Sequence, residues 1–256
     1  MSPYVKQHAH APDGFFEAEA AGLAWLAEAT PAGGARVVRV ESVAPGRIVL
    51  EQIAEARPTP EHMRAFGAAL AATHAAGAEA FGAPPAGWTG PTFIGSRPQE
   101  TTPTESWGAF YAAQRVLPSA RVAVGAGSLT PGELEVVERA CRAVAGGAFD
   151  DGSAPARLHG DLWAGNVLAD ADGVVLIDPA AHGGHRETDL AMLQLFGCPH
   201  LDAVLAGYEA ASRLRAGWRE RVPLHQLHPL AVHAAGHGRG YGTALVDAAE
   251  AVLRLG

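Results

Sequence analysis

The sequence predicts an α+β fold with two lobes, a small N-terminal lobe of strands and one helix, and a larger, mainly helical C-terminal lobe. Short β-branched runs and a single amphipathic helical pattern make up residues 1–53, whereas helical patterns dominate residues 54–256. One further β-hairpin pattern interrupts those helices at residues 167–177. A chain of 256 residues is long enough for two such lobes to share a cleft.

The N-terminal lobe begins with a strand that ends at "PYVK", residues 3–6. A helix follows over residues 13–29, with Asp13 as its expected cap and with Pro31 and the Gly33–Gly34 pair ending it. The β-branched runs "ARVVRVESV" and "RIVLEQI" stand on either side of "APG", which predicts a hairpin.

The C-terminal lobe opens with a long amphipathic helix from Pro60, and a Pro/Gly-rich loop follows over residues 81–103. Thr104 is the expected cap of the next helix. Another helix starts with a capping box, because Thr130 precedes Pro131 and Glu133 stands three residues after the cap. Beyond the hairpin we expect helical segments over residues 186–196, 201–212 and 221–255.

Composition narrows the class of partner. The formal net charge is −8 and no long basic run occurs, so nucleic acid and anionic membranes are not expected partners. The two cysteines, Cys141 and Cys198, have no paired spacing, which favours a reducing compartment. The N-terminus has no signal-peptide core, and no apolar run reaches the length of a membrane span. We therefore expect a cytoplasmic protein.

The stretch "RLHGDLWAGNVLADADGVVLIDP", residues 157–179, holds the main chemical signal. Asp172-Gly173 predicts a tight turn between two strands, so Asn166 and Asp178 should lie side by side at the open end of a hairpin, with Asp161 just upstream. The spacing from His159 to Asp161, Asn166 and Asp178 matches the catalytic loop and metal-binding Asp of protein kinases.

Phosphoryl-transfer chemistry assigns a role to each residue. Asp161 is the expected catalytic base for the attacking hydroxyl, and Asn166 and Asp178 are the expected Mg²⁺ ligands, since Mg²⁺ prefers oxygen donors. The alternative is a structural hairpin that carries surface acids.

Kinase chemistry also needs a Lys that contacts phosphate and a Glu that holds the Lys. Lys6 ends the first strand, and Glu19 on the next helix is its expected partner in preference to Glu17. The alternative is that Glu17 and Glu19 are solvated acids near the start of the helix, where the helix dipole favours negative charge. Residues 51–53 connect the lobes, and their backbone groups are expected to bind adenine; they are Glu51, Gln52 and Ile53.

Several motifs resemble the fructosamine kinase or ketosamine kinase family, a branch of the aminoglycoside-phosphotransferase-like kinases. They are "HGDLWAGN", "IDPAAHGGHRETDLAMLQLFG", "YVKQHAHAPDGFFEAEAAGLAWL", "TFIGSRPQE" with "SWGAFYAAQRVLPSA", and "LHQLHPLAVHAAGHGRGYG". The resemblance covers almost the whole chain. It implies a bilobal protein-kinase-like fold, ATP and Mg²⁺ as cofactors, and phosphorylation of a ketosamine sugar at its 3-hydroxyl. In the family this product releases the amine, so the expected acceptor is a small ketosamine or a glycated amine or protein.

Carried over by motif, Asp161 resembles the family's base, Asn166 and Asp178 its metal ligands, and Lys6 with Glu19 its phosphate-binding pair. The resemblance gives Trp163 as the aromatic wall for the sugar; an indole face suits the apolar side of a sugar and a substrate ammonium. A buried packing role is the alternative for Trp163. Outside this set, the helix start at Arg186, Glu187 and Asp189 is expected to brace the catalytic loop through ion pairs.

The sequence departs from the family pattern at two places. An Asn usually follows "PQ" in the family, whereas this chain reads "PQETTP". The family also has two strands and a Gly-rich loop before the Lys strand, and only five residues precede Lys6 here. We therefore expect a truncated N-terminal β lobe and weaker use of ATP. A nucleotide-binding pseudokinase remnant, a start-site error, and a related kinase for an aminoglycoside- or choline-like hydroxyl remain alternatives.

Overall fold

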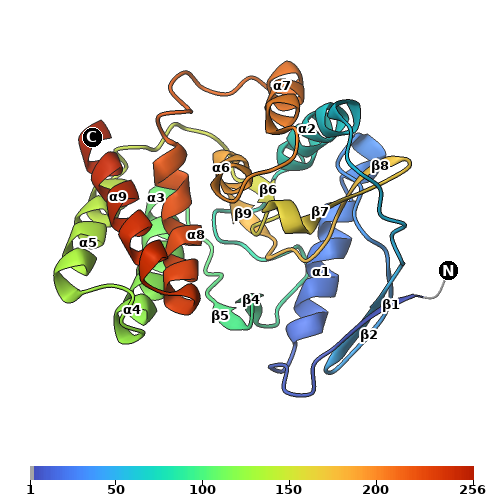
Figure 1. Cartoon of the computed structure of the whole chain (residues 1–256), viewed down its shortest axis with the longest axis horizontal. Coiled ribbons are helices and arrows are strands. Elements are labelled where there is room, and N and C mark those ends of the chain that lie inside the picture. Colours follow the sequence, from blue (N-terminus) through green and yellow to red (C-terminus); the bar gives the residue numbers. More distant parts are fainter. Residues whose placement is uncertain (1–2) are drawn as a thin grey trace.

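The N-terminal part of the chain is a three-stranded antiparallel sheet crossed by one helix. The computed structural model describes residues 3–256, and its first sheet has the order β1-β3-β2. The strands are β1 (Tyr4–Gln7), β2 (Val40–Ala44) and β3 (Arg47–Leu50), and α1 (Phe15–Ala27) packs against β2 and β3 (Figure 1). The predicted strand, helix and hairpin are confirmed.

Helix starts follow local capping chemistry. The predicted Asp13 cap is wrong, because α1 begins after Gly14, whose φ of 79° turns the chain without any side-chain cap. The predicted Thr104 cap is also wrong, since the hydroxyl of Ser106 accepts the N–H of Ala109 and caps the helix two residues later. The capping box of Thr130 and Glu133 is confirmed.

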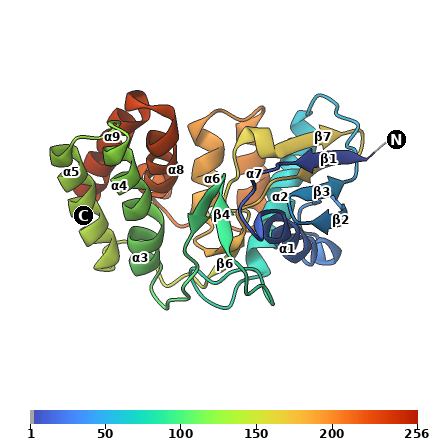
Figure 2. The same ribbon diagram turned by 90° about the horizontal axis from the view of Figure 1, so that it is seen from below.

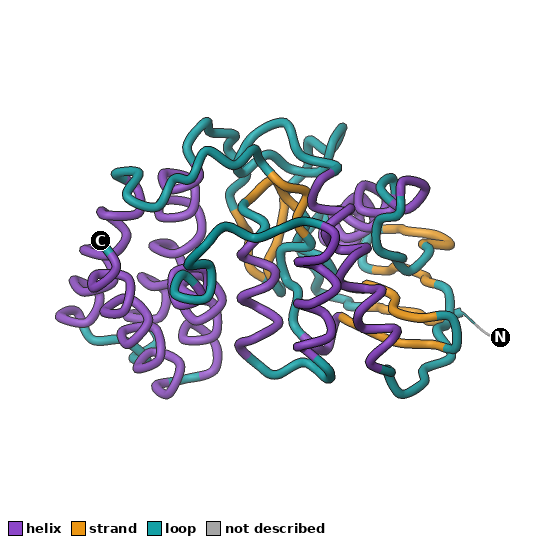
Figure 3. Tube along the Cα trace, turned by 90° about the horizontal axis from the view of Figure 1, so that it is seen from above, coloured by secondary structure: helices purple, strands orange, loops and turns teal. Residues whose placement is uncertain are grey.

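The remaining helices form the larger part of the molecule. In Figures 1 and 2 the helices at the C-terminal end gather at one side and the first sheet lies at the other, and Figure 3 shows the same separation of helix from strand. The predicted continuous run over 221–255 is wrong, because Gly238 with φ of 96° divides it into two helices. The helices are α2 (Pro60–Ala75), α3 (Trp107–Phe110), a π-helical turn (Tyr111–Val116), α4 (Leu117–Gly125), α5 (Pro131–Ala145), α6 (Glu187–Leu195), α7 (Leu201–Ala211), α8 (Val222–His237) and α9 (Arg239–Leu255).

The predicted hairpin lies against the N-terminal sheet. It consists of β7 (Val167–Asp170) and β8 (Gly173–Leu176), paired antiparallel with Val167 opposite Leu176. Val175 is buried in one apolar cluster with Phe16, Leu23 and Ile48 of the first lobe. The backbone of residues 36–38 also bonds to Leu176 through two N–H···O contacts of 2.9 Å. Val174 and Leu176 pack in a second cluster with α2, so the hairpin is fixed to both the N-terminal and the helical elements.

Four short strands were not predicted, and two of them lie in the segment over residues 81–103 that was predicted as a loop. They are β4 (Thr92–Ile94) and β5 (Arg97–Gln99), which form a hairpin, and β6 (Ala156–Leu158) and β9 (His182–Gly184), which pair antiparallel. Each has three residues, too few for a periodic pattern to show. Tertiary contacts hold them, since Arg97 donates to the carbonyls of Val232 and Ala235 on α8.

No helix within residues 3–256 combines the length and the apolar character needed to cross a bilayer.

Candidate active site

The hairpin brings Asn166 and Asp178 together, as the sequence predicts. Asn166 ends a short 3₁₀ turn before β7, and Asp178 follows β8 after one residue. The N–H of Ile177 donates to the Asn166 carbonyl at 3.2 Å, and Asn166 Nδ2 donates to the Asp178 carbonyl at 3.4 Å. Asp178 has φ of 54°, a left-handed conformation that Asp tolerates better than most side chains.

Asp161 lies on the loop between β6 and the hairpin, beside Asn166. Asn166 Nδ2 donates to the Asp161 carbonyl at 2.8 Å and to its Oδ2 at 3.3 Å. Gly160 makes this loop possible: its φ is 82°, and a Cβ there would lie 2.1 Å from the Ala180 carbonyl oxygen. Any other residue at 160 would displace the loop that carries Asp161.

His159 fixes the loop from inside the protein. Its ring is fully buried, and Nε2 donates to the Ile177 carbonyl at 2.8 Å while Nδ1 accepts the Asp161 N–H at 3.3 Å. Burial lowers the pKa of His159. The neutral tautomer with its proton on Nε2 satisfies both bonds, so His159 ties the Asp161 loop to the strand that leads into Asp178.

Asp189 on α6 holds the same loop through its backbone. Its two carboxylate oxygens accept the N–H groups of His159 and Gly160 at 2.8 and 3.0 Å. His74 on α2 lies 3.1 Å from Asp189 Oδ2 and 2.8 Å from the Tyr208 hydroxyl. All three of these side chains are buried, so the loop position depends on a closed network rather than on surface contacts. The predicted bracing role is confirmed for Asp189, through hydrogen bonds to backbone rather than an ion pair with Arg.

The environment of Asp161 favours its protonated form. Burial raises the pKa of Asp161 to about 7, the nearby carboxylates of Asp178 and Asp189 add to the shift, and the hydrogen bond from Asn166 opposes it. A carboxyl group with a pKa near neutrality is well matched to accept a proton from a hydroxyl.

Lys6 joins the two lobes. Its Nζ lies 2.8 Å from Glu19 Oε1 and also contacts Asp178 Oδ1. Burial opposes the charge, but the two carboxylates outweigh it and raise the pKa of Lys6. Glu19 is the partner that the sequence favours over Glu17, whose Oε2 is buried with no hydrogen-bond partner among residues 3–256.

Two cavities meet at Lys6 and Asp178. One of about 170 Å³ is lined by the connector residues Glu51, Gln52 and Ile53, with apolar walls from Val38, Leu50, Leu168 and Ile177. The other, of about 650 Å³, is lined by Glu19, Asp161, Trp163 and Asn166. Lys6 and Asp178 line both. All nine predicted site residues therefore line one or both of two neighbouring cavities that share Lys6 and Asp178, a smaller one with apolar walls and a larger, more open one.

Trp163 is exposed at the edge of the larger cleft. Its side chain is 42% exposed, which excludes the alternative of a buried packing residue. Its ring meets Phe196 edge-on at 6.4 Å, and Phe196 in turn contacts His233 on α8 at 4.5 Å. Sequence reasoning missed a further aromatic wall, Phe93 of β4, which packs on Phe15 at 5.3 Å in the same cleft. The Pro and Gly residues around Phe93 had marked that segment as loop.

The donor set at the hairpin fits a hard divalent cation. The Asn166 amide nitrogen is used in donating to Asp161, which leaves Oδ1 as the ligand atom. Asp178 is the neighbouring residue in the same cleft, where its carboxylate contacts Lys6, and the side chains of Asn166 and Asp178 both offer oxygen donors of the kind that Mg²⁺ prefers. Asn166 and Asp178 are therefore the residues that would hold the metal.

A second buried group of possible ligands, His185, Glu187 and His225, is already satisfied within the protein. Arg221 donates to both Glu187 oxygens at 2.6 and 2.9 Å, and the Glu187 N–H donates to His185 Nδ1 at 3.2 Å. Glu187 therefore forms an ion pair, but it joins α6 to Arg221 and does not brace the catalytic loop. The predicted ion pair of Arg186 is wrong, because its guanidinium bonds to Ser212 and to the Arg213 carbonyl. The cluster joins α6 to the start of α8.

Comparison with known proteins agrees with this geometry. The family model described as fructosamine kinase matches residues 2–254. A probable ketoamine kinase of Enterococcus faecium is 31% identical over 94% of this chain and 83% of its own, and one of Synechocystis is 31% identical over 94% and 79%.

Solved structures give the same result. A candidate fructosamine-3-kinase from Thermobifida fusca superposes with a TM-score of 0.90 at 49% identity, over 98% of this chain and 85% of that one. An aminoglycoside phosphotransferase bound to gentamicin shares the fold alone, with a TM-score of 0.57 at 14% identity. The chain has the α+β, protein-kinase-like fold, it belongs to the fructosamine kinase family, and it is a kinase of small molecules.

Proposed function

We propose that this kinase transfers the γ-phosphoryl group of ATP to the 3-hydroxyl of a ketosamine such as a fructosamine or a ribulosamine. One observation carries the proposal: Asp161, Asn166, Asp178 and Lys6 meet between an apolar slot suited to adenine and an open cleft walled by Trp163. The family supports the acceptor class. The product is a sugar phosphate ester that would release its amine, which is a deglycation reaction on a free or protein-bound amine.

In this proposal each side chain has one task. The backbone of residues 51–53 binds adenine, and Lys6, held by Glu19, binds the phosphates. Asp161 takes the proton of the acceptor hydroxyl. The hydroxyl oxygen forms the new bond to the γ-phosphorus as the bond between that phosphorus and the ADP oxygen breaks. Mg²⁺ bound at Asn166 and Asp178 would supply neutralisation of the phosphate charge.

Trp163 is the side chain that favours an acceptor with both a sugar and an amine. Its exposed indole face offers a flat apolar surface to the C–H side of a sugar, and its π-system attracts the ammonium of the amine portion. Glu19 and Asp178 add negative charge to the same cleft. A neutral sugar has no ammonium group for the indole and the carboxylates to attract, which supports a ketosamine as the acceptor.

The pH dependence of kcat/KM for the acceptor should report Asp161. The base must be ionised, and its pKa lies at about 7, so activity should rise with pH and level off above neutrality. We expect roughly tenfold lower kcat/KM at about pH 6 than on the plateau near pH 8. The stability of the folded protein should change in the opposite direction. Because the pKa of Asp161 is raised in the folded state, the free energy of unfolding falls as the pH rises through that pKa. A flat rate profile would contradict the assignment.

Trp163→Ala should raise the KM for a ketosamine by about tenfold and leave the KM for ATP unchanged, since the ring borders only the acceptor cleft. Trp163→Phe is the matched variant, and it should retain most of the affinity. The melting temperature should not move, because the side chain is exposed. An equal rise in both KM values would argue against an acceptor wall.

A panel of acceptors tests the proposed substrate class. ADP release from ATP is measured with a fructosamine, a ribulosamine, choline and an aminoglycoside at equal concentration. The proposal expects turnover with the ketosamines well above the other two. Turnover restricted to choline or the aminoglycoside would leave the kinase assignment intact and overturn the acceptor.

A further inference from the structure

The β4–β5 hairpin brings an aromatic side chain into the acceptor cleft, the cavity of about 650 Å³ that Asp161 and Trp163 also line. This side chain is Phe93, the middle residue of β4. Phe93 is half-buried whereas Thr92 and Ile94 on either side are buried, as expected when the side chains of a strand alternate between two faces. In Figures 1 and 2 β4 lies beside α1 of the N-terminal part.

Phe93 forms an aromatic pair with Phe15, the first residue of α1. The two rings meet edge-on at 5.3 Å, and Phe15 in turn meets Phe16 at 5.1 Å. Phe16 is buried in the apolar cluster that includes Leu23 and Ile48. Phe15 and Phe93 are both half-buried and both line the acceptor cleft. The Phe15–Phe93 pair is therefore an aromatic surface of the cleft that the core supports from behind.

The hairpin that carries Phe93 is fixed to the helical part of the molecule. Arg97 donates to the carbonyls of Val232 and Ala235 at 3.2 and 2.7 Å, in the last two turns of α8, where the helix dipole favours a positive charge. Just after β5, the Gln114 amide accepts the N–H of Thr102 at 3.0 Å and donates to its carbonyl at 2.8 Å. These contacts position the ring before any ligand binds, which lowers the entropy lost on binding.

The Phe15–Phe93 pair and Trp163 belong to different elements of the same cleft. Trp163 stands two residues after Asp161, so a sugar whose hydroxyl reaches Asp161 lies near the indole, while Lys6 and the metal ligands take the phosphates. The volume of about 650 Å³ is in the range of sites that enclose drug-sized ligands, which are larger than one sugar ring. Space beside the pair is therefore left for the group attached to the sugar.

We propose that the Phe15–Phe93 pair binds the apolar part of the amine substituent of the acceptor. The kinase then prefers ketosamines of amines that carry an aromatic or alkyl chain over ketosamines of small amines. This inference rests on the proposed ketosamine reaction and names the class of amine. Aromatic walls favour such a chain by burying its apolar surface and by edge-to-face contact with a second ring. Phe93 would determine specificity, and Arg97 would position Phe93 through the hairpin.

Calorimetric titration of the full chain with two fructosamines that differ only in the amine substituent tests the proposal. One compound carries an N-methyl group and the other an N-benzyl group, so both have the same sugar and the same ammonium charge. We expect the benzyl compound to bind about tenfold more tightly, because its phenyl ring is removed from water against the aromatic pair. The affinity is measured without nucleotide and does not depend on turnover.

Variants of the hairpin separate the amine contact from the sugar contact. Phe93→Ala should reduce the preference to about twofold or less, and an unchanged affinity for the methyl compound would show that the variant folds. Phe93→Leu, which stays apolar, should keep an intermediate preference. Arg97→Gln should lower the preference, and Arg97→Lys, which keeps the charge at the end of α8, should restore part of it. Trp163→Ala should weaken both compounds alike, since they share the sugar and the ammonium.

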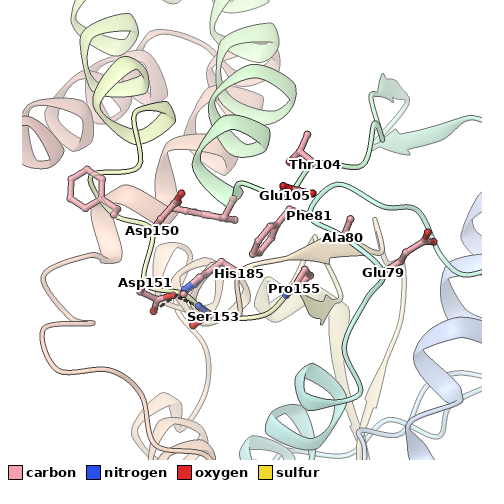
Figure 4. A pocket seen from close by; sticks show the side chains of 13 residues that line it. Glu79, Ala80, Phe81, Thr104, Glu105, Asp150, Asp151, Ser153, Pro155 and His185 are labelled. Atoms are coloured by element: carbon pink, nitrogen blue, oxygen red, sulfur yellow. Dashed lines mark hydrogen bonds and ion pairs between the residues drawn. The ribbon is translucent and has the colours of Figure 1, made fainter.

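A separate cavity of about 420 Å³ offers carboxylates to the same ammonium and serves as the control. It shares no lining residue with the acceptor cleft, and Figure 4 shows Glu79 and Glu105 among its walls. Both side chains are exposed, so Glu79→Gln and Glu105→Gln are expected to fold. Neither variant should change the affinity for either compound.

Equal affinity of the two compounds for the parent chain, absence of binding, or a preference that Phe93→Ala leaves intact would overturn the proposal. Loss of the preference with Glu79→Gln or Glu105→Gln would overturn it as well. ADP release judges the proposed reaction separately. Phosphorylation of both compounds with equal affinity would overturn the amine preference alone, whereas tighter binding of the benzyl compound without phosphorylation of either would overturn the reaction alone.

Discussion

Replacing Asp161 with Asn should lower kcat by about 100- to 10,000-fold, the range that a general base contributes, while Mg-ATP binding should change little. Asn keeps the size and the hydrogen bond with Asn166 but cannot take a proton. Coupled detection of ADP gives kcat, and calorimetry with a non-hydrolysable nucleotide gives the affinity.

The matched variant is Asp172→Asn, which removes a carboxylate at the exposed turn of the same hairpin. We expect it to keep the activity of the parent chain. A similar loss in both variants would mean that charge near the hairpin matters rather than the base. Turnover that Asp161→Asn does not reduce would contradict the role of Asp161.

Asp189→Ala should lower the free energy of unfolding by about 3–5 kcal/mol, the cost of breaking a buried charged network by removing one member. The change leaves the N–H groups of His159 and Gly160 and the ring of His74 without their acceptor in a dry interior. The loop that carries Asp161 would also lose its position, so kcat should fall. Urea denaturation followed by fluorescence measures the stability.

Two other variants sharpen the comparison. Asp189→Asn keeps one acceptor oxygen and should lose less stability than the Ala variant. Glu250→Ala removes an exposed carboxylate that pairs with Arg254 one turn away, and it should cost no more than about 0.5 kcal/mol. A loss below about 1 kcal/mol for Asp189→Ala would show that the network does not hold the loop.

Features set by local chemistry were predictable from sequence. The Asp172-Gly173 turn fixes the register of β7 and β8, and this register places Asn166 beside Asp178. The capping box at Thr130 depends on residues three apart in the chain. Lys6 and Glu19 were paired because kinase chemistry needs a Glu on a nearby helix to hold the Lys, and their contact at 2.8 Å agrees.

Features that depend on distant contacts were not predictable. The β4–β5 hairpin is held by Arg97 on the carbonyls of α8, more than one hundred residues away in sequence, and its own three-residue strands carry no pattern. The helix start at Gly14 gave no signal distinct from the adjacent Asp13, which is a common cap residue. The partners of Asp189, namely His74 and Tyr208, are ordinary core positions in sequence and acquire their role only through packing.

The identity of the phosphorylated product tests the central proposal most directly. Purified chain is incubated with Mg-ATP and a fructosamine labelled in its sugar carbons, and phosphorus and carbon NMR follow the mixture. We predict one phosphate ester for each ADP formed, attached to the oxygen of carbon 3, and its absence with Asp161→Asn. Binding of ATP without any ester from several ketosamines, or an ester on another oxygen, would contradict the proposed reaction.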